Sequence, residues 1–370
     1  MLGLPSGMLG VAWPAMRVAL DAPLAGLGIL VAAWTAAHFV ATAATGTLAG
    51  LLGTSRLASL AAFTAAIGLI LLASVASWPQ AIIAALFIGL GTAGLDASIN
   101  THVALAGGVR SMGVLHASWA VGAATGPATV GLAEALASWR AAYVGAALAF
   151  VAIALLLNLL RPERIATTAT PQGEGRAIPD ASVNVLLGAA MFFFYVGLET
   201  AAGQWAYVDL TIERGLSGII AGWGVSLFFA ALAAGRVLLG VGGHRISPQR
   251  ELDASVALAL AGAAGYWLLP PEIAALVALP LLGLGLSVFI PVLIAFTPAR
   301  VGVATTASAV GVQFAAGTIG GGAFPPAIGL AMQSLAVPVL GPAATLLAGA
   351  LVALHTASRS RASRSATAGW

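Results

Sequence analysis

Two carboxylates lie deep inside long apolar segments of this sequence, where an ionised group is costly. Ten of the twelve acidic residues lie in polar stretches or near the ends of apolar ones, whereas Asp96 and Glu199 do not. A charge in such surroundings is unfavourable unless it is paired, hydrogen-bonded or neutralised by a proton. Asp96 and Glu199 are therefore the first candidates for proton exchange or for binding a polar ligand.

The segment around Asp96 reads Gly-Leu-Asp-Ala-Ser-Ile-Asn over 94–100, and helical spacing places Asn100 on the same face one turn later. His116 begins the next apolar segment and is expected at a similar depth. A carboxylate and an imidazole in a low-dielectric interior can exchange a proton near neutral pH. We interpret Asp96 and His116 as proton-coupling residues. The alternative is a structural clasp, in which Asp96 is hydrogen-bonded to the backbone or to His116.

The segment before Glu199 reads Phe-Phe-Phe-Tyr-Val-Gly-Leu-Glu over 192–199, which places Tyr195 one turn earlier on the same helical face. Gln204 follows near the end of the same segment. We interpret Glu199 as a second proton-coupling residue, with Tyr195 and Gln204 as substrate contacts. The alternative is a Glu that extends toward the polar boundary of its segment.

Four further residues could line a cavity and contact a substrate. Trp34 and His38 are one helical turn apart, Gln313 lies in another apolar segment, and Trp119 could stack on a ring-shaped solute. For Trp34, His38 and Gln313, a packing role is about as good an explanation. For Trp119, a place at the apolar–polar boundary is the commoner role.

The composition shows what kind of molecule must position these residues. Of 370 residues, 60% are hydrophobic and only 7% are charged, and the mean hydropathy is +1.01. A soluble domain carries about 25% charged residues, so a soluble enzyme, a nucleic-acid-binding protein and a disordered chain are excluded. The absence of Cys excludes disulfides and thiolate metal sites. We expect no metal, no cofactor and no nucleic-acid partner.

Apolar runs bounded by Arg, Pro or acidic clusters predict an all-α membrane protein. A helix needs about 20 mostly apolar residues to cross a bilayer. The candidate spans are 2–19, 25–48, 57–77, 80–104, 112–136, 140–159, 183–206, 217–240, 252–269, 273–297, 302–330 and 335–356. They predict twelve transmembrane helices in two pseudo-symmetric six-helix bundles. Pro14 and Arg17 interrupt the first span, so we expect a short or incomplete first helix, or a start codon further upstream.

The basic residues, all fifteen of which are Arg, indicate the orientation. With both termini cytoplasmic, eleven of them lie on the inner side and three on the outer side, as the positive-inside rule requires. We interpret the fifteenth, Arg236, as a cytoplasmic anchor or a cap for helix carbonyls rather than as a substrate ligand. The prediction is a multi-pass, monomeric protein of a bacterial-type cytoplasmic (inner) membrane, in contact with lipid.

A polar stretch divides the spans into two sets of six. We predict an N-terminal bundle over 1–159, a cytoplasmic linker over 160–182, a C-terminal bundle over 183–356 and a cytoplasmic tail over 357–370. The two sets resemble each other at a fixed offset in the fifth and eleventh spans. The matching pairs are Gly122 with Gly320, Pro127 with Pro325, Gly131 with Gly329, Leu132 with Leu330 and Ala133 with Ala331. Six plus six spans with parallel repeats is a pattern of transporters whose substrate site lies between the halves.

This layout resembles the major facilitator superfamily over essentially the whole chain. The family's loop signature, Gly-x-x-x-Asp followed by basic residues, has a degenerate counterpart after the second span. That counterpart is the stretch from Gly46 to Gly50, with Gly in place of the Asp and Arg56 as the nearby base. The resemblance implies two rocking halves, but not the charge relay of the intact signature.

The segments around Asp96 and Glu199 resemble the acidic motifs of the fucose:proton symporter branch of that superfamily. In that branch the fourth span usually carries Glu-x-x-x-Asn, whereas this chain has Asp96 for the Glu and Thr101 where a Pro follows the Asn. The resemblance implies that Asp96 is the proton site and that Asn100 contacts the substrate. It favours a secondary active transporter that moves a small polar, sugar-like solute by proton-coupled alternating access.

Two other functions were weighed. Glycines from Gly113 to Gly131, with Pro127, resemble the antiporter motif of drug:proton exporters, so a proton-coupled exporter of drugs or lipophilic metabolites is the alternative. An intramembrane enzyme is not expected, because Ser226 lacks a Gly-x-Ser-Gly setting and Asp96 has no second intramembrane Asp as partner. The expected partners are therefore a small-molecule substrate, protons and membrane lipid.

Overall fold

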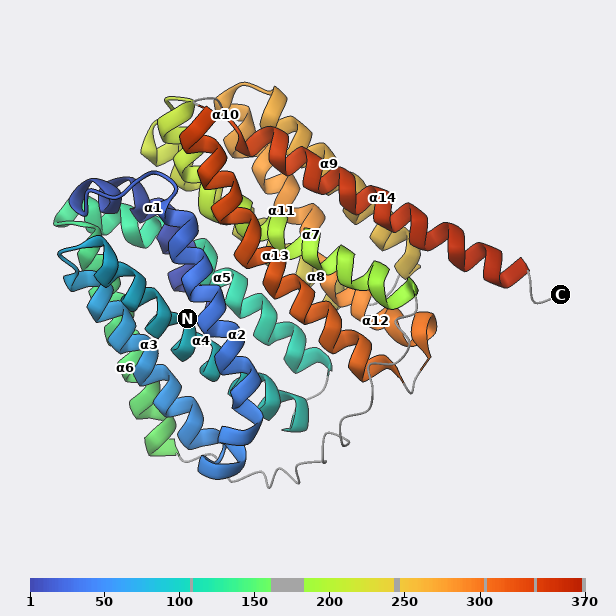
Figure 1. Ribbon diagram of the computed structural model, residues 1–370, viewed down its shortest axis with the longest axis horizontal. Helices are drawn as coiled ribbons and strands as arrows, with labels where there is room; N and C mark the ends of the chain where they lie inside the picture. Colours follow the sequence, from blue (N-terminus) through green and yellow to red (C-terminus); the bar gives the residue numbers. More distant parts are fainter. Residues whose placement is uncertain (107–108, 161–182, 243–246, 303–304, 336–337, 368–370) are drawn as a thin grey trace.

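The protein is a bundle of long helices (Figure 1). The computed structural model describes residues 1–106, 109–160, 183–242, 247–302, 305–335 and 338–367. Within these ranges the regular secondary structure is helical, without strands. The first half contains α1 (Leu4–Ala19), α2 (Gly26–Leu52), α3 (Thr54–Ser74), α4 (Trp78–Ala106), α5 (Val109–Leu136) and α6 (Trp139–Leu160).

The second half contains α7 (Val183–Val208), η1 (Asp209–Glu213), α8 (Gly218–Gly242), α9 (Pro248–Leu268), α10 (Pro271–Ile273), η2 (Ala274–Ala278), α11 (Leu279–Ser287), α12 (Phe289–Val301), α13 (Thr306–Leu335) and α14 (Leu340–Thr367). Its tenth crossing is interrupted, with α10, η2, α11 and α12 following one another along one span. Eight helical segments of the described chain are long and apolar enough to cross a membrane, and α1, α5, α9 and α13 complete the twelve. The predicted fold class, twelve helices in two bundles, is confirmed.

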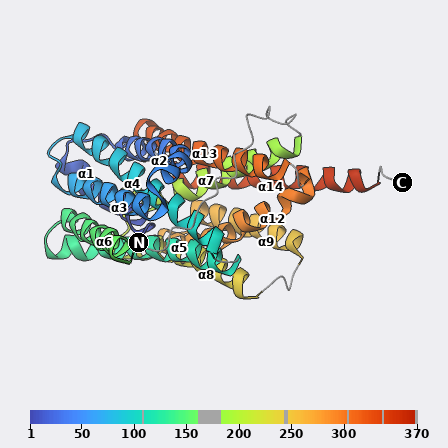
Figure 2. The ribbon, with the colours of Figure 1, turned by 90° about the horizontal axis from the view of Figure 1, so that it is seen from below.

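Two ends of the bundle can be distinguished. Because α6 ends at Leu160 and α7 begins at Val183, the intervening residues connect the halves at one end, which we call the linker end. The opposite end is the distal end. The α14 helix continues to Thr367, through residues that the sequence assigned to a tail, and projects beyond the second half (Figure 2).

The first helix is short and packs closely on its neighbours. It has 16 residues and contains Pro14. A Cβ atom at Gly7 would lie 2.0 Å from the carbonyl oxygen of Ala123 in α5, and one at Gly10 would lie 2.2 Å from that of Gln204 in α7. Glycine at these positions therefore allows α1 to approach backbone in both halves.

The seam between the halves is symmetric in its helix pairs. At this seam α2 packs against α13 and α5 packs against α8. The second crossing of each half therefore packs against the fifth crossing of the other half. The two views show the α2–α13 pair side by side (Figures 1 and 2). This pairing is what a parallel six-plus-six repeat produces.

Two hydrogen bonds between described residues join the halves. The Ala25 amide donates to Gln333 Oε1 at 3.0 Å, and Gln204 Nε2 donates to the Ser6 carbonyl at 2.9 Å. Ala25 and Gln333 lie at the distal ends of α2 and α13, whereas Ser6 lies near the start of α1, away from the distal end of that helix at Ala19. The seam is therefore bonded both at the distal end and nearer its middle.

Candidate functional site

Asp96 lies in the second half of α4 and is partly buried. Asn100 Nδ2 donates to the Asp96 backbone carbonyl at 2.8 Å, and the amide also lies near the carboxylate. The hydroxyls of Thr92 and Ser98 donate to carbonyls of their own helix, so they do not donate a hydrogen bond to the Asp96 carboxylate. Among the described side chains no cation forms an ion pair with Asp96. The structure thus places an acid and an amide on one helix face, as the spacing predicted.

The predicted pairing of Asp96 with His116 falls outside the described side chains. His116 belongs to α5, whose backbone is described there, but its imidazole is not. Its proton-coupling role stays a prediction.

Glu199 lies near the middle of α7 and faces a cation from another helix. Arg236 of α8 places Nη2 3.7 Å from Glu199 Oε2 and donates to the Tyr195 hydroxyl at 3.4 Å. The Tyr195 ring is fully buried and stacks on Phe289 of α12, with ring centroids 5.0 Å apart and planes 8° apart. Three helices of the second half therefore define the position of this acid–arginine–tyrosine group.

The structure corrects the role assigned to Arg236. It lies six residues before the linker end of α8, about 9 Å along the helix axis. A basic side chain at this depth ordinarily extends toward the nearby polar surface. Arg236 contacts Glu199 and Tyr195 of α7 instead, so it is neither an anchor nor a helix cap. Sequence reasoning missed this partner because no local spacing links α8 to α7.

The remaining predicted substrate contacts are dispersed. Gln204 is buried in the contact between α7 and α1, where its amide is bonded to Ser6. Gln313 is buried against α12, with its amide 3.3 Å from the Thr297 hydroxyl, and lies beside Gly188 of α7. The structure therefore does not bring these two amides to Glu199, and their role in binding substrate stays a prediction.

The aromatic candidates and His38 lie in the first half. Trp119 of α5 meets Phe229 of α8 edge to face, with ring centroids 6.2 Å apart, so it lies on the seam between the halves. Trp34 of α2 packs against the core, and its carbonyl meets α4 at Gly89. His38 is partly buried one turn further along α2.

The glycines of α5 pack against α1. A Cβ atom at Gly126 would lie 2.5 Å from the carbonyl carbon of Gly7, and one at Gly122 would lie 3.2 Å from the amide nitrogen of Leu4. Close helix approach through small residues is a common means of packing in membranes. This contact explains part of the exporter-like glycine pattern without any role in transport.

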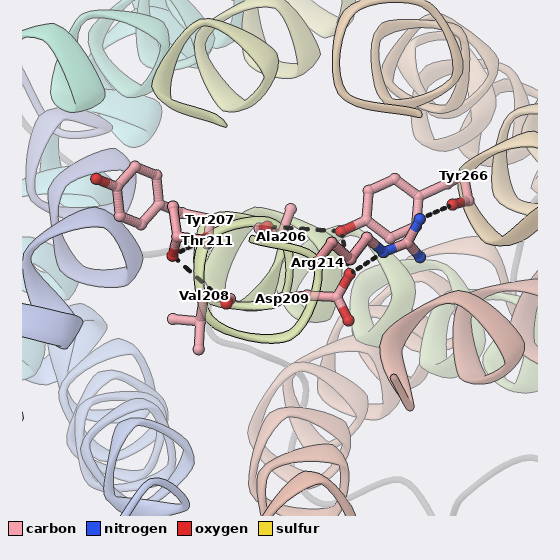
Figure 3. A network of polar contacts seen from close by, with 7 residues as sticks. All are labelled: Ala206, Tyr207, Val208, Asp209, Thr211, Arg214 and Tyr266. Atoms are coloured by element: carbon pink, nitrogen blue, oxygen red, sulfur yellow. Dashed lines mark hydrogen bonds and ion pairs between the residues drawn. The ribbon is translucent and has the colours of Figure 1, made fainter. Parts of the chain in front are cut away.

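A second acid–arginine–tyrosine group, which the sequence analysis had left among span ends, lies at the distal end of α7 (Figure 3). Asp209 is fully buried, and its Oδ2 accepts from Arg214 Nε at 2.9 Å and from the Tyr266 hydroxyl at 2.7 Å. Arg214 Nη1 donates to the Tyr266 carbonyl at 2.7 Å, and the guanidinium lies 4.6 Å from the centre of the Tyr266 ring.

The π-helical turn η1 brings Arg214 to Asp209. The Arg214 amide donates to the Asp209 carbonyl at 3.0 Å, which closes the wide turn. An acid followed five residues later by an Arg was the available signal. An α-helix places such a pair on different faces, so the signal points to an ion pair only if the turn widens.

Comparisons with known proteins agree with this architecture. A family model described as Major Facilitator Superfamily matches residues 1–325. No curated protein sequence gives a significant match. Among solved structures, the nucleoside transporter NupG superposes with a TM-score of 0.73 at 17% identity, covering 97% of this chain and 98% of that one.

Two further solved structures are similar over nearly the whole chain. The fucose:proton symporter FucP of E. coli has a TM-score of 0.64 at 17% identity, covering 96% of this chain and 97% of its own. A bacterial homologue of the human lysosomal transporter Spinster, inward-facing and occupied, has a TM-score of 0.73 at 17% identity, with 98% and 94% covered. At these identities the likeness shows the fold.

Proposed function

The chain belongs to the Major Facilitator Superfamily, and from this premise we propose that it is a secondary active transporter for a small polar, sugar-like solute, driven by protons through alternating access. We assign it no enzymatic reaction. We further propose that it works as a monomer in a bacterial-type inner membrane, with both termini and the 160–182 linker in the cytoplasm. The Arg distribution supports this orientation.

The proposal rests mainly on the partial burial of Asp96 and on the lack of an ion pair between it and any described cation. Its carboxylate lies partly buried within a membrane helix, and no described cation forms an ion pair with it. An acid in such a position binds and releases protons more readily than one locked in an ion pair. Asn100, one turn along the same face, is available to bind a solute hydroxyl next to the proton site.

The connection between the halves supports alternating access. The hydrogen bonds between described residues of the two halves are Ala25–Gln333, at the distal end, and Ser6–Gln204, nearer the middle of the seam. With the linker in the cytoplasm, the distal end is the outer one. The α2–α13 and α5–α8 pairs then provide the surfaces on which one half rocks against the other.

The names of two structural neighbours support the solute class. One is a nucleoside transporter and the other a fucose:proton symporter, and both names refer to polar, ring-containing solutes. The alternative, a proton-coupled exporter of drugs or lipophilic metabolites, relies on the glycine pattern of α5. Packing against α1 accounts for Gly122 and Gly126 of that pattern, which weakens the alternative.

The first experiment identifies a solute class by thermal shift of the purified protein. The probes are sugars, nucleosides, organic acids and lipophilic drugs. Stabilisation by polar ring compounds supports the proposal, and stabilisation by drugs alone supports the exporter. The best probe is then used for uptake into proteoliposomes with and without an inward proton gradient.

The second experiment tests the proton site with Asp96→Asn. We expect this variant to lose gradient-driven uptake but to keep counterflow exchange, which needs binding and rocking without net proton movement. Glu272→Gln, a change of an exposed acid within α10, is the matched control and should behave as the unmodified protein. Loss of both uptake and exchange in Asp96→Asn would indicate a structural role and contradict the assignment.

A further inference from the structure

Arg236 is a buried cation whose charge is only loosely compensated. Its side chain is 11% exposed and that of Glu199 is 13% exposed. A guanidinium remains charged at any physiological pH and, when buried, requires hydrogen-bonded partners for its five donors. Burying such a residue costs free energy, and the hydrogen bonds and charges around it show how much of that free energy the protein recovers.

The contacts of Arg236 leave most of its donors unused. The Glu199 oxygen is 3.7 Å from Nη2, beyond hydrogen-bonding distance, and the bond to the Tyr195 hydroxyl is long at 3.4 Å. Among the described residues, Nε and Nη1 have no partner. Arg214, by contrast, uses both corresponding nitrogens in bonds of 2.9 and 2.7 Å.

A guanidinium binds a carboxylate in a bidentate manner through Nη2 together with Nε or Nη1, and among the described residues Nη2 of Arg236 has only the loose contacts at 3.4 and 3.7 Å. The Tyr195 hydroxyl, held in place by the Phe289 stack, lies beside both Arg236 and Glu199 and can donate to a bound anion. Among the described residues, the ionisable side chains that meet here are Glu199, Tyr195 and Arg236. The α12 and α13 neighbours of this part of α7, Phe289 and Phe324, are uncharged.

We propose that Arg236 binds a carboxylate group of the transported solute, so that the solute is a small acid such as a sugar acid or hydroxy acid. This inference rests on the proposed transport function and names the substrate class of the second-half site. When the solute carboxylate takes the place of Glu199 beside the guanidinium, Glu199 accepts one proton from the aqueous solution. The site then holds one cation and one anion both before and after binding, which avoids a net buried charge.

The test uses pairs of compounds that differ only in the acid group. The probes are D-glucuronate with D-glucose, D-galacturonate with D-galactose, and lactate with 1,2-propanediol. We expect an acid to raise the melting temperature of the purified protein while its neutral partner does not. Arg236→Gln should weaken that acid's affinity at least about tenfold, the loss expected for a charge-assisted hydrogen bond. Arg250→Gln, an exposed Arg of α9, is the matched control and should keep the affinity.

Arg236→Gln leaves Glu199 without a cation, and this unpaired charge could itself misfold the protein. A second variant therefore separates loss of binding from loss of folding. The double variant Arg236→Gln with Glu199→Gln removes both charges and should fold, yet still lose acid binding. Glu199→Gln alone should keep acid binding and lose the uptake of one proton, measured by calorimetry in buffers of different ionisation enthalpy. Equal shifts from acids and neutral partners, no shift from any acid, or full binding by the double variant would overturn the inference.

The outcomes also separate this inference from the proposed function. Arg236-dependent acid binding without proton-driven uptake would support the carboxylate site and contradict proton coupling. Proton-driven uptake of a neutral sugar that survives Arg236→Gln would support the transporter and contradict the carboxylate site.

Discussion

Two acid–arginine–tyrosine groups lie along α7, and they differ in how closely their charges are held. At the distal end, Asp209 and Arg214 are 2.9 Å apart and the Tyr266 hydroxyl bonds the same carboxylate oxygen at 2.7 Å. Near mid-helix, Glu199 and Arg236 are 3.7 Å apart. The residue types are almost the same, so residue identity alone does not distinguish a close, hydrogen-bonded ion pair from a long one.

Chain connection explains part of the difference. Arg214 follows Asp209 within the same widened turn, and its Nη1 and ring contact with Tyr266 join α7 to α9. Arg236 reaches Glu199 from a separate helix. The first group joins α7 to α9 at the distal end, where a rigid connection serves the fold. The side chains of the second pair, Arg236 and Glu199, are 11% and 13% exposed, and their contact is longer.

The largest effect is expected when the close Asp209–Arg214 pair is broken. Arg214→Gln leaves the fully buried Asp209 without its cation, and the loss of one partner of a buried ion pair costs about 3–5 kcal/mol. Arg236→Gln should cost less, about 1–2 kcal/mol, because the contact it loses is longer. Unfolding titrations in mixed detergent micelles measure both. Equal losses would remove the distinction between the two groups.

The tyrosines should differ in the same direction. Tyr266→Phe removes a 2.7 Å hydrogen bond to a buried carboxylate and should destabilise the protein by about 1.5–2 kcal/mol. Tyr195→Phe removes a 3.4 Å bond and should cost about 0.5 kcal/mol or less, while it weakens solute binding. The same unfolding titrations, combined with ligand thermal shifts, test this; a stability loss for Tyr195→Phe as large as that for Tyr266→Phe would contradict it.

Glu199→Gln should affect transport more than stability. The substitution keeps the size of the side chain and removes a charge that is only loosely paired, so we expect a stability change within about 1 kcal/mol. Solute affinity or the pH dependence of uptake should change between about pH 5 and 8, the range in which a proton-coupled acid acts. Uptake that is unchanged across this range would exclude Glu199 from coupling.

A third acid–arginine contact should show the smallest loss of stability when it is broken. Arg359 of α14 lies 2.5 Å from Asp253 of α9, but its side chain is 57% exposed. Arg359→Gln should therefore cost about 0–1 kcal/mol, and the cost should decrease further at high salt. Unfolding titrations at low and high ionic strength measure it. A loss comparable to that of Arg214→Gln would show that distance, and not burial, dominates these pairs.

Much of the architecture could be predicted because it depends on properties read along the chain. The length of an apolar run determines whether a helix can cross a bilayer, and the twelve candidate spans correspond to the observed crossings. Helical spacing also placed Asn100 beside Asp96 and Tyr195 beside Glu199, because neighbours three or four residues apart share a face.

Contacts between different helices could not be predicted from the sequence in this way. Arg236 lies 37 residues after Glu199 on a different helix, and no helical spacing relates the two. The burial of Asp209 depends on Tyr266 of α9, and the place of Gln204 depends on Ser6 of α1. Gly122 and Gly126 of α5 were interpreted as part of a motif, whereas in the structure they allow the close approach of α1.

By itself the sequence determined a twelve-helix membrane protein with two acids in its apolar interior, because hydrophobicity and helical period are local quantities. Only the tertiary structure decided which cation each acid of α7 meets and at what distance. Those distances follow from how the helices pack, and packing depends on the shapes of side chains far apart in the chain. The difference between 2.9 and 3.7 Å, on which the proposed distinction between the two pairs depends, is set by this packing.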